Sequence, residues 1–270
     1  MKKSHSAVAA ALLAPLFVGI APLSAETLHY TINWQSGLSL GEAALQISKG
    51  GSKPAPAPVP ASDSGSAAAP AATPPPPPPP PPSPSKPTPE GGWNFQLTLD
   101  AAVPGFVIRD EYKSRTDAKF CSQEFERTVQ RGSKKSSERS TFDQDKRTVK
   151  RITEFEGGLK GGISDMDTVE CAHDALAFLQ FMRNELAQGR LVAHQPVYFG
   201  GRYDLQVNYI GNDIVKLGDK RIEADMIRVN SHGLKSDFEV DIYFSKDENR
   251  TPLMARIPLS LGTFTVELMR

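Results

Sequence analysis

The sequence predicts a mainly β protein, built as an antiparallel meander with one packed α-helix. Short segments that alternate apolar and polar residues recur along most of the chain, which is the period-2 pattern of strands with one buried face. Short stretches of turn-forming residues lie between these segments, as expected where consecutive strands pair antiparallel. One segment, residues 174–188, instead repeats its apolar residues at helical spacing.

The first 25 residues predict a secretory signal peptide. Lys2 and Lys3 form a basic start, residues 7–23 form an apolar core, and Ala25 supplies a small residue for cleavage. The alternative is a retained membrane anchor, but the apolar run is shorter than the roughly 20 residues that a spanning helix needs. We therefore expect an exported protein with no transmembrane span after cleavage.

Residues 26–49 predict a hairpin at the start of the mature chain. Its first strand places four apolar residues on one face: Leu28, Tyr30, Ile32 and Trp34. After a turn at 35–37, the apolar phase of the second strand changes at Gly41, which predicts a β-bulge. An isolated hairpin is marginal in water, so these residues must belong to a larger sheet.

A Pro- and Ala-rich insertion, residues 50–92, interrupts this sheet and contains nine consecutive prolines. Strand alternation resumes directly after it, at Trp93 and Phe95. We expect a disordered loop within one β domain, residues 26–270, because the entropy of loop closure rises only slowly with length. A spacer is one interpretation of the insertion, and a docking segment for a protein partner is the other.

The C-terminal part predicts four further strands and the helix. The strands are expected at residues 203–211, 237–245, 252–260 and 262–269, with turns at 211–213, 218–219 and 247–249. In the helix, Asp174 is the expected N-cap and Gly189 follows the end. Its apolar stripe, which includes Leu179 and Met182, is expected to pack on the sheet. The alternative is a helix that binds a membrane or a partner.

Three segments carry a resemblance to a known family. Residues 30–47 contain an aromatic-x-aliphatic strand, a Trp-x-x-Gly turn and a Gly-Glu-Ala return strand. Residues 174–190 run from an Asp to an Arg through the helix, and residues 243–268 contain a Ser-x-Asp-x-x-x-x-Pro strand pair. Together they resemble the exported bacterial family called domain of unknown function 3108 (DUF3108).

The resemblance implies a large curled antiparallel sheet, in the form of a spiral, roll or open barrel, and a location in the cell envelope. It brings no catalytic residues with it. Where the family often has Ser in the helix motif, this chain has Ala177, so no nucleophilic role is expected there. The proline-rich insertion is not part of the family pattern.

The charge balance gives no reason to expect nucleic acid as a partner. The chain has 31 basic and 31 acidic residues, and two of the basic ones lie in the signal peptide. Basic residues cluster at 127–151, but Glu and Asp are interleaved with them. We interpret this cluster as solvated strand edges and turns rather than as an anion-binding patch.

The two cysteines, Cys121 and Cys171, predict a disulfide, as expected for an even pair in an exported protein. The bond would close a loop of about 50 residues and stabilise the fold by roughly 4 kcal/mol. The alternative is an envelope hydrolase that uses Cys171, His173 and Asp174. An oxidised cysteine cannot act as a nucleophile, so the two interpretations exclude each other.

No catalytic, cofactor-binding or metal-binding residues are predicted. The sequence contains no His pair at i, i+4, no Cys-x-x-Cys and no Gly-x-Ser-x-Gly motif. Asp165 and Asp167 offer carboxylates for calcium, but the segment lacks the spacing of an EF-hand. We expect a solvated turn there.

These features, with the location that the resemblance implies, predict a non-enzymatic, periplasmic bacterial cell-envelope protein. A single curled sheet must bury its apolar face, and the helix covers only part of it. The remaining concave surface is expected to bind a lipid, a lipoprotein or a cell-wall glycan. Two alternatives stay open: the hydrolase, and a structural scaffold whose rolled sheet fills its interior with its own side chains.

Overall fold

The computed structural model describes residues 25–50, 91–103, 106–156, 159–233, 237–259 and 262–269. Most of the predicted signal peptide and of the insertion therefore lies outside the described residues. The strands are β1 (Ala25–Trp34), β2 (Ser39–Lys49), β3 (Trp93–Val103), β4 (Phe106–Thr116), β5 (Ser122–Arg131), β6 (Lys134–Asp143), β7 (Thr148–Phe155) and β8 (Leu159–Asp167). After β9 (His173–Asp174) and helix α1 (Ala175–Ala187) come β10 (His194–Tyr198), β11 (Arg202–Leu217), β12 (Lys220–Gly233), β13 (Asp237–Ser245), β14 (Pro252–Leu259) and β15 (Gly262–Leu268).

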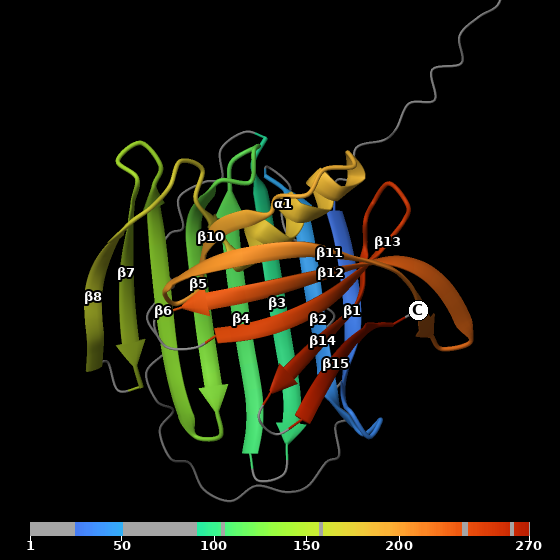
Figure 1. Cartoon of the computed structure of the whole chain (residues 1–270). Helices are drawn as coiled ribbons and strands as arrows, with labels where there is room; N and C mark the ends of the chain where they lie inside the picture. The colour runs from blue at the N-terminus through green and yellow to red at the C-terminus, as the bar shows by residue number, and fades with distance from the viewer. Residues whose placement is uncertain are drawn as a thin grey trace, which may run out of the picture.

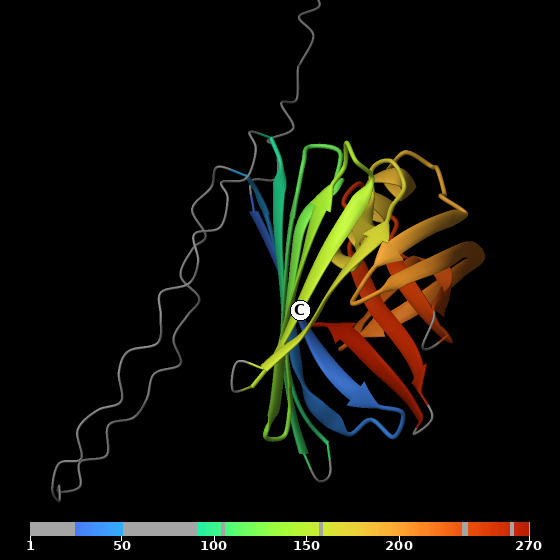
Figure 2. The same cartoon turned by 90° about the vertical axis from the view of Figure 1, so that its left-hand side faces the viewer.

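The described strands form one 15-stranded sheet in the order β8-β7-β6-β5-β4-β3-β2-β1-β15-β14-β13-β12-β11-β10-β9. Neighbouring strands pair antiparallel, except for the short parallel contact of β9 with β10. The sheet curls back on itself so that β11–β13 lie across the inner side of β3–β6 (Figure 1). Its two edges, β8 and β9, are not paired with each other, and the result is an open roll (Figure 2). This confirms the predicted mainly β, curled antiparallel meander.

Glycine bulges shape two of the long strands. The predicted bulge at Gly41 is confirmed, because the pairing of β1 with β2 shifts there. A Cβ at position 41 would lie 2.0 Å from the carbonyl oxygen of Asp100, so only glycine fits. The predicted turn at 211–213 is wrong: β11 continues through it, and Gly211 forms a second bulge opposite Met226. Pairing with β12 on both sides of Gly211 prevents a reversal of the chain.

The insertion joins two paired strands. Lys49 at the end of β2 lies opposite Trp93 at the start of β3, and the Gly50 N–H donates to the Gly92 carbonyl. The two ends of the insertion therefore lie side by side, as in a hairpin whose loop has been lengthened. The strands on both sides of the insertion are neighbours in one sheet.

Two apolar clusters fill the roll. The larger one joins inner-face residues of β1–β7, such as Phe95 and Phe125, to residues of β10–β15, among them Tyr243 and Leu253. The smaller one places the helix against β10–β13: Phe178, Met182 and Leu186 pack with residues such as Ile227 and Phe244. The predicted helix, with its N-cap at Asp174, is confirmed and packs on the sheet. Within the described residues, no helix has the length and apolar character needed to cross a membrane.

Candidate functional site

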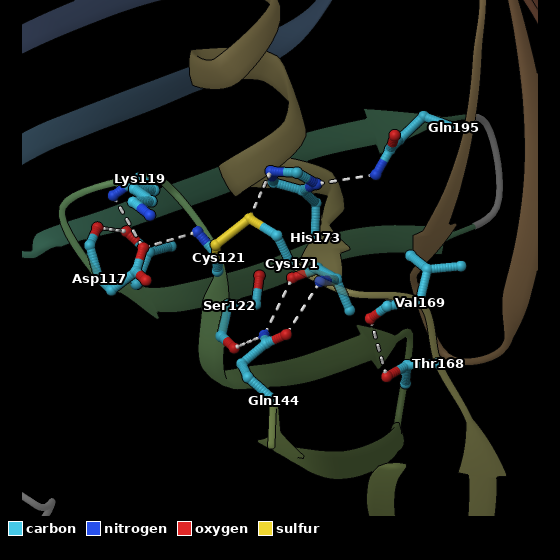
Figure 3. Close-up of a disulfide and its surroundings, with 12 residues drawn as sticks. Asp117, Lys119, Cys121, Ser122, Gln144, Thr168, Val169, Cys171, His173 and Gln195 are labelled. Carbon is cyan, nitrogen blue, oxygen red and sulfur yellow. Dashed lines mark hydrogen bonds between the residues drawn. A yellow bond between two sulfur atoms is a disulfide. The ribbon is translucent and has the colours of Figure 1, made fainter. Parts of the chain in front are cut away.

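The predicted disulfide is present in the structure and links Cys121 to Cys171 (Figure 3). It fastens the turn between β4 and β5 to the segment that leads into β9. Gln144 reinforces this link, because its side-chain amide donates to the carbonyls of Ser122 and Ala172 and accepts from the Ala172 N–H. The cysteines thus join two parts of the fold that are 50 residues apart in sequence.

Asp174 is fully buried, and its carboxylate caps the helix. One oxygen accepts from the backbone N–H groups of Leu176 (2.9 Å) and Ala177 (3.1 Å). The other accepts from the hydroxyls of Ser114 and Ser122, both at 2.6 Å. Burial raises the pKa of Asp174, and these hydrogen bonds oppose the rise. The carboxylate is therefore occupied by the helix and the sheet and does not orient His173.

His173 is also buried. Its ring stacks on Phe181 at 4.7 Å between centroids, and its Nδ1 lies 3.1 Å from the side-chain nitrogen of Gln195. Burial lowers the pKa of His173 to about 4, so the imidazole is neutral near pH 7. Its Nε2 lies 3.8 Å from the Cys171 sulfur, which is held in the disulfide. The arrangement gives Cys171, His173 and Asp174 structural roles, and it does not assemble the relay that a hydrolase needs.

Asp165 and Asp167 lie in β8 rather than in a solvated turn, so that prediction is wrong. Their segment pairs with β7, where Lys150 lies opposite Asp165 and Thr148 opposite Asp167. Across the described part of the chain, no three His, Cys, Asp or Glu side chains gather where they would hold a metal ion.

The inner faces of β1–β3 carry apolar side chains, whereas those of β4–β7 carry charged side chains beside apolar ones such as Phe125 and Phe142. In one cross-strand row, Tyr112, Arg127, Glu138 and Thr153 lie opposite one another. Strand alternation places them on the same side as the buried core residue Phe125. We call this surface the inner wall, and its residues are Asp110, Tyr112, Arg127, Val129, Arg131, Ser136, Glu138, Arg151, Thr153 and Phe155.

The inner wall is partly uncovered. Phe155 is 52% exposed, and the side chains of Arg131 and Arg127 are 43% and 28% exposed. In Figure 1, β11–β13 cross in front of the upper part of β4–β6, and the lower ends of β4–β7 extend beyond them. These exposures show that the described residues cover the inner wall only in part.

Asp110 is the fully partnered carboxylate of the inner wall. The Arg131 guanidinium donates to both of its oxygens, with 2.6 Å between Nη2 and Oδ2, and the Tyr112 hydroxyl donates at 2.8 Å. The hydrogen bond to Asp110 raises the pKa of Arg131. Burial, with a further contribution from Asp110, raises the pKa of Tyr112. This trio is charged, ordered and chemically satisfied.

Arg127 and Glu138 are much less satisfied. The Arg127 guanidinium lies over the Phe199 ring, 5.4 Å from its centroid, and 3.9 Å from the nearer Glu138 oxygen. That separation is longer than a hydrogen bond. The Glu138 side chain is 6% exposed, and its Oε1 accepts no hydrogen bond from any described residue. The wall thus offers an acceptor beside a donor, both with unused capacity.

The outer face of the same sheet has a shallow hollow of about 420 Å³. Its lining mixes both signs of charge, including Glu42, Asp100, Arg109 and Lys135. A smaller hollow of about 270 Å³ on β5–β7 shares Thr128 with it. Charged side chains are ordinary on a solvated sheet face and unusual on the inside of a roll. The inner wall is therefore the stronger candidate site.

The inner wall was not predicted from the sequence. The interpretation of residues 127–151 as solvated edges and turns is wrong for Arg127, Glu138 and Arg151, which point inward. A signal was available in β6, where Glu138 has the same parity as the buried Phe142. Without the register of β5 and β7, that parity does not reveal which face is inside.

These features define the class: an open, antiparallel β-roll that carries a disulfide and a charged inner wall. The family model described as "Protein of unknown function (DUF3108)" matches residues 91–269, and the chain belongs to this family. The resemblance seen in the sequence is thereby confirmed.

The chain is also similar to a solved β-barrel-like protein of domain of unknown function DUF1849 from Brucella abortus. The two share 8% identity with a TM-score of 0.50, over 90% of this chain and 95% of that one. At this identity the likeness shows the fold alone. A search of curated proteins finds no match.

Proposed function

We propose that the protein is a non-enzymatic envelope protein that holds a cell-wall glycan on its inner wall. The observation that carries the proposal is a charged, partly exposed surface on the concave side of the roll, where core residues are expected. The predicted signal peptide and the Cys121–Cys171 disulfide support a location outside the cytoplasm.

The chemistry of the inner wall suits a ligand rich in hydroxyl groups. Carboxylates such as Glu138 only accept hydrogen bonds, and guanidinium groups such as Arg127 only donate them. A hydroxyl does both, so a sugar can use both kinds of partner on one surface. The exposed ring of Phe155 adds an apolar platform beside them. Such a mixture of apolar surface and a few oriented polar groups is typical of ligand sites.

A lipid is the weaker ligand for this surface. The apolar inner faces of β1–β3 are packed against β11–β15, so side chains such as Leu45 and Phe95 are already buried. An acyl chain on the inner wall would offer no hydrogen bond to Arg127, which lacks one among the described residues. A glycan therefore fits the wall better than a lipid or a lipoprotein tail.

Co-sedimentation with insoluble cell-wall material tests the proposal. The mature chain is expected to sediment with the wall, and the Phe155→Ala variant is expected to bind roughly tenfold more weakly, the loss of about 1.4 kcal/mol of contact. Ile163→Ala is the matched control, since Ile163 is 61% exposed on the neighbouring strand and points to the outer face. Equal loss in both variants, or no retention of the unmodified chain, would reject the glycan and leave the scaffold alternative.

A further inference from the structure

We infer that Arg127 and Glu138 recognise an amide group, so that the glycan bound by the inner wall contains N-acetylated amino sugars. This inference rests on the proposed function and adds the chemical class of the ligand. Its starting point is the pair of unsatisfied groups in the middle of the wall, where an acceptor and a donor lie opposite each other on β6 and β5.

The Glu138 carboxylate has no structural partner that accounts for it. Its Oε1 is buried and accepts no hydrogen bond from the described part of the chain, and its Oε2 is 3.9 Å from Arg127. A buried carboxylate oxygen without a donor is costly. The equivalent acid nearby, Asp110, accepts three hydrogen bonds from Arg131 and Tyr112. Glu138 thus has an unpartnered acceptor oxygen where Asp110 has none.

Arg127 supplies the complementary donor. Its guanidinium is held over the Phe199 ring, and the ion pair that it forms among the described residues is with Glu138 at 3.9 Å. Since its side chain is 28% exposed, a ligand group can reach it from the open side of the roll. The contact with the Phe199 ring holds the cation in place without using its N–H groups, and within the described part of the chain these groups remain free to donate to a ligand.

An amide matches this pair better than a hydroxyl alone. Its N–H donates to a carboxylate and its carbonyl accepts from a guanidinium, so one amide offers a partner to each kind of group in this pair. Both bonds are charge-assisted, which makes them stronger than bonds between neutral groups. The acetamido group is the part of an amino sugar that provides an amide.

The chain contains a matched control pair. Glu126 and Arg139 lie opposite each other on the same two strands, one position along the ladder and on the outer face. They form an ion pair at 2.5 Å, and Arg139 also contacts Glu124. Neutralising this outer pair changes the same charges on the same strands without touching the inner wall.

Isothermal titration with two tetrasaccharides tests the inference, one built from N-acetylglucosamine and the other from glucose with the same linkage. The unmodified chain is expected to bind the acetylated sugar at least tenfold more tightly. Glu138→Gln and Arg127→Met are expected to remove this preference, a loss of tenfold or more that corresponds to one charge-assisted hydrogen bond. Glu126→Gln and Arg139→Met are expected to retain it.

Thermal unfolding of the same variants separates ligand recognition from structure. Because the Glu138 oxygen is unpartnered, Glu138→Gln is expected to melt at or above the temperature of the unmodified chain. If it melts lower and the preference persists in Arg127→Met, the pair is structural and the inference is wrong. Equal affinity for the two sugars would also overturn the inference but leave the proposed function in place. Failure to bind either sugar or the insoluble wall would overturn both.

Discussion

Buried ionisable side chains hold the fold together at the scale of single residues. Asp174 caps the helix and accepts two serine hydroxyls from the sheet, and His173 stacks beside it as a neutral ring. The sequence predicted Asp174 as an N-cap, since this depends only on local order. It did not predict Ser114 and Ser122 as partners, because they come from strands 60 and 52 residues away in sequence.

His173 is expected to make stability fall in mild acid. In the unfolded chain the imidazole takes up a proton near its ordinary pKa of 6.5, whereas the folded chain resists protonation until about pH 4. The unfolded state therefore binds more protons in this window and is favoured as the pH falls. We expect a loss on the order of 3 kcal/mol between pH 6.5 and pH 4.

Chemical denaturation of the unmodified chain and of His173→Gln across this pH range measures the effect. The variant lacks the titrating group, so its free energy of unfolding is expected to change less over the same window. Parallel pH profiles for the two proteins would show that burial of His173 does not control acid stability.

At the scale of elements, the helix is held by contacts at both ends and along its side. Arg183, in the helix, forms an ion pair with Glu26 of β1 at 2.8 Å and donates to the carbonyls of Asn249 and Arg250. Asn249 and Arg250 lie in the turn between β13 and β14, where the Ser245 hydroxyl donates to Asp247. The helix and Ser-x-Asp segments that carry the family resemblance therefore meet in space, and this contact gives them a structural role.

The disulfide is the second anchor of this region. Replacing both Cys121 and Cys171 with Ala removes the constraint on a loop of about 50 residues and is expected to cost roughly 4 kcal/mol. Urea denaturation with and without a reducing agent measures the change. Reduction is expected to destabilise the unmodified chain and to leave the double variant unaffected. Unchanged stability of the double variant would contradict a structural role for the bond.

The proline-rich insertion is expected to be dispensable for folding. Its ends already meet, because Gly50 is hydrogen-bonded to Gly92 at the end of the β2–β3 pair. Replacing residues 50–92 with a short glycine-rich turn should therefore leave the melting temperature within a few degrees of the original. Loss of a cooperative transition in the shortened chain would show that the insertion supports the core.

Regular strands and the helix were predictable from the sequence, and irregular features were predictable only in part. The phase change at Gly41 marked a real bulge, because it interrupts an alternation that is visible in the sequence. Gly211 forms a similar bulge, but its neighbours Asn212 and Asp213 favour a turn, and only pairing with β12 excludes one. Local preference was therefore overruled by the partner strand.

At the scale of the whole molecule, the curl of the sheet decides which faces are buried. The inner faces of β1–β3 meet β11–β15, whereas the lower inner face of β4–β7 remains open (Figure 1). No local sequence pattern predicts how far β11–β13 extend over the inner face of β4–β7. The exposed inner wall was therefore not predictable from the sequence. The wall nevertheless follows from strand register once the curl is known.

The most direct test of the account is methyl NMR of the chain during titration with soluble cell-wall glycan fragments. The methyl groups of Ile108 and Val129 lie on the inner face of β4 and β5, and those of Ile163 and Ile214 are exposed away from it. We predict that the fragments shift the Ile108 and Val129 signals in a saturable way and leave the other two unchanged. Saturable shifts confined to Ile163 or Ile214, or no shifts at concentrations where the chain is retained by the insoluble wall, would contradict binding on the inner wall.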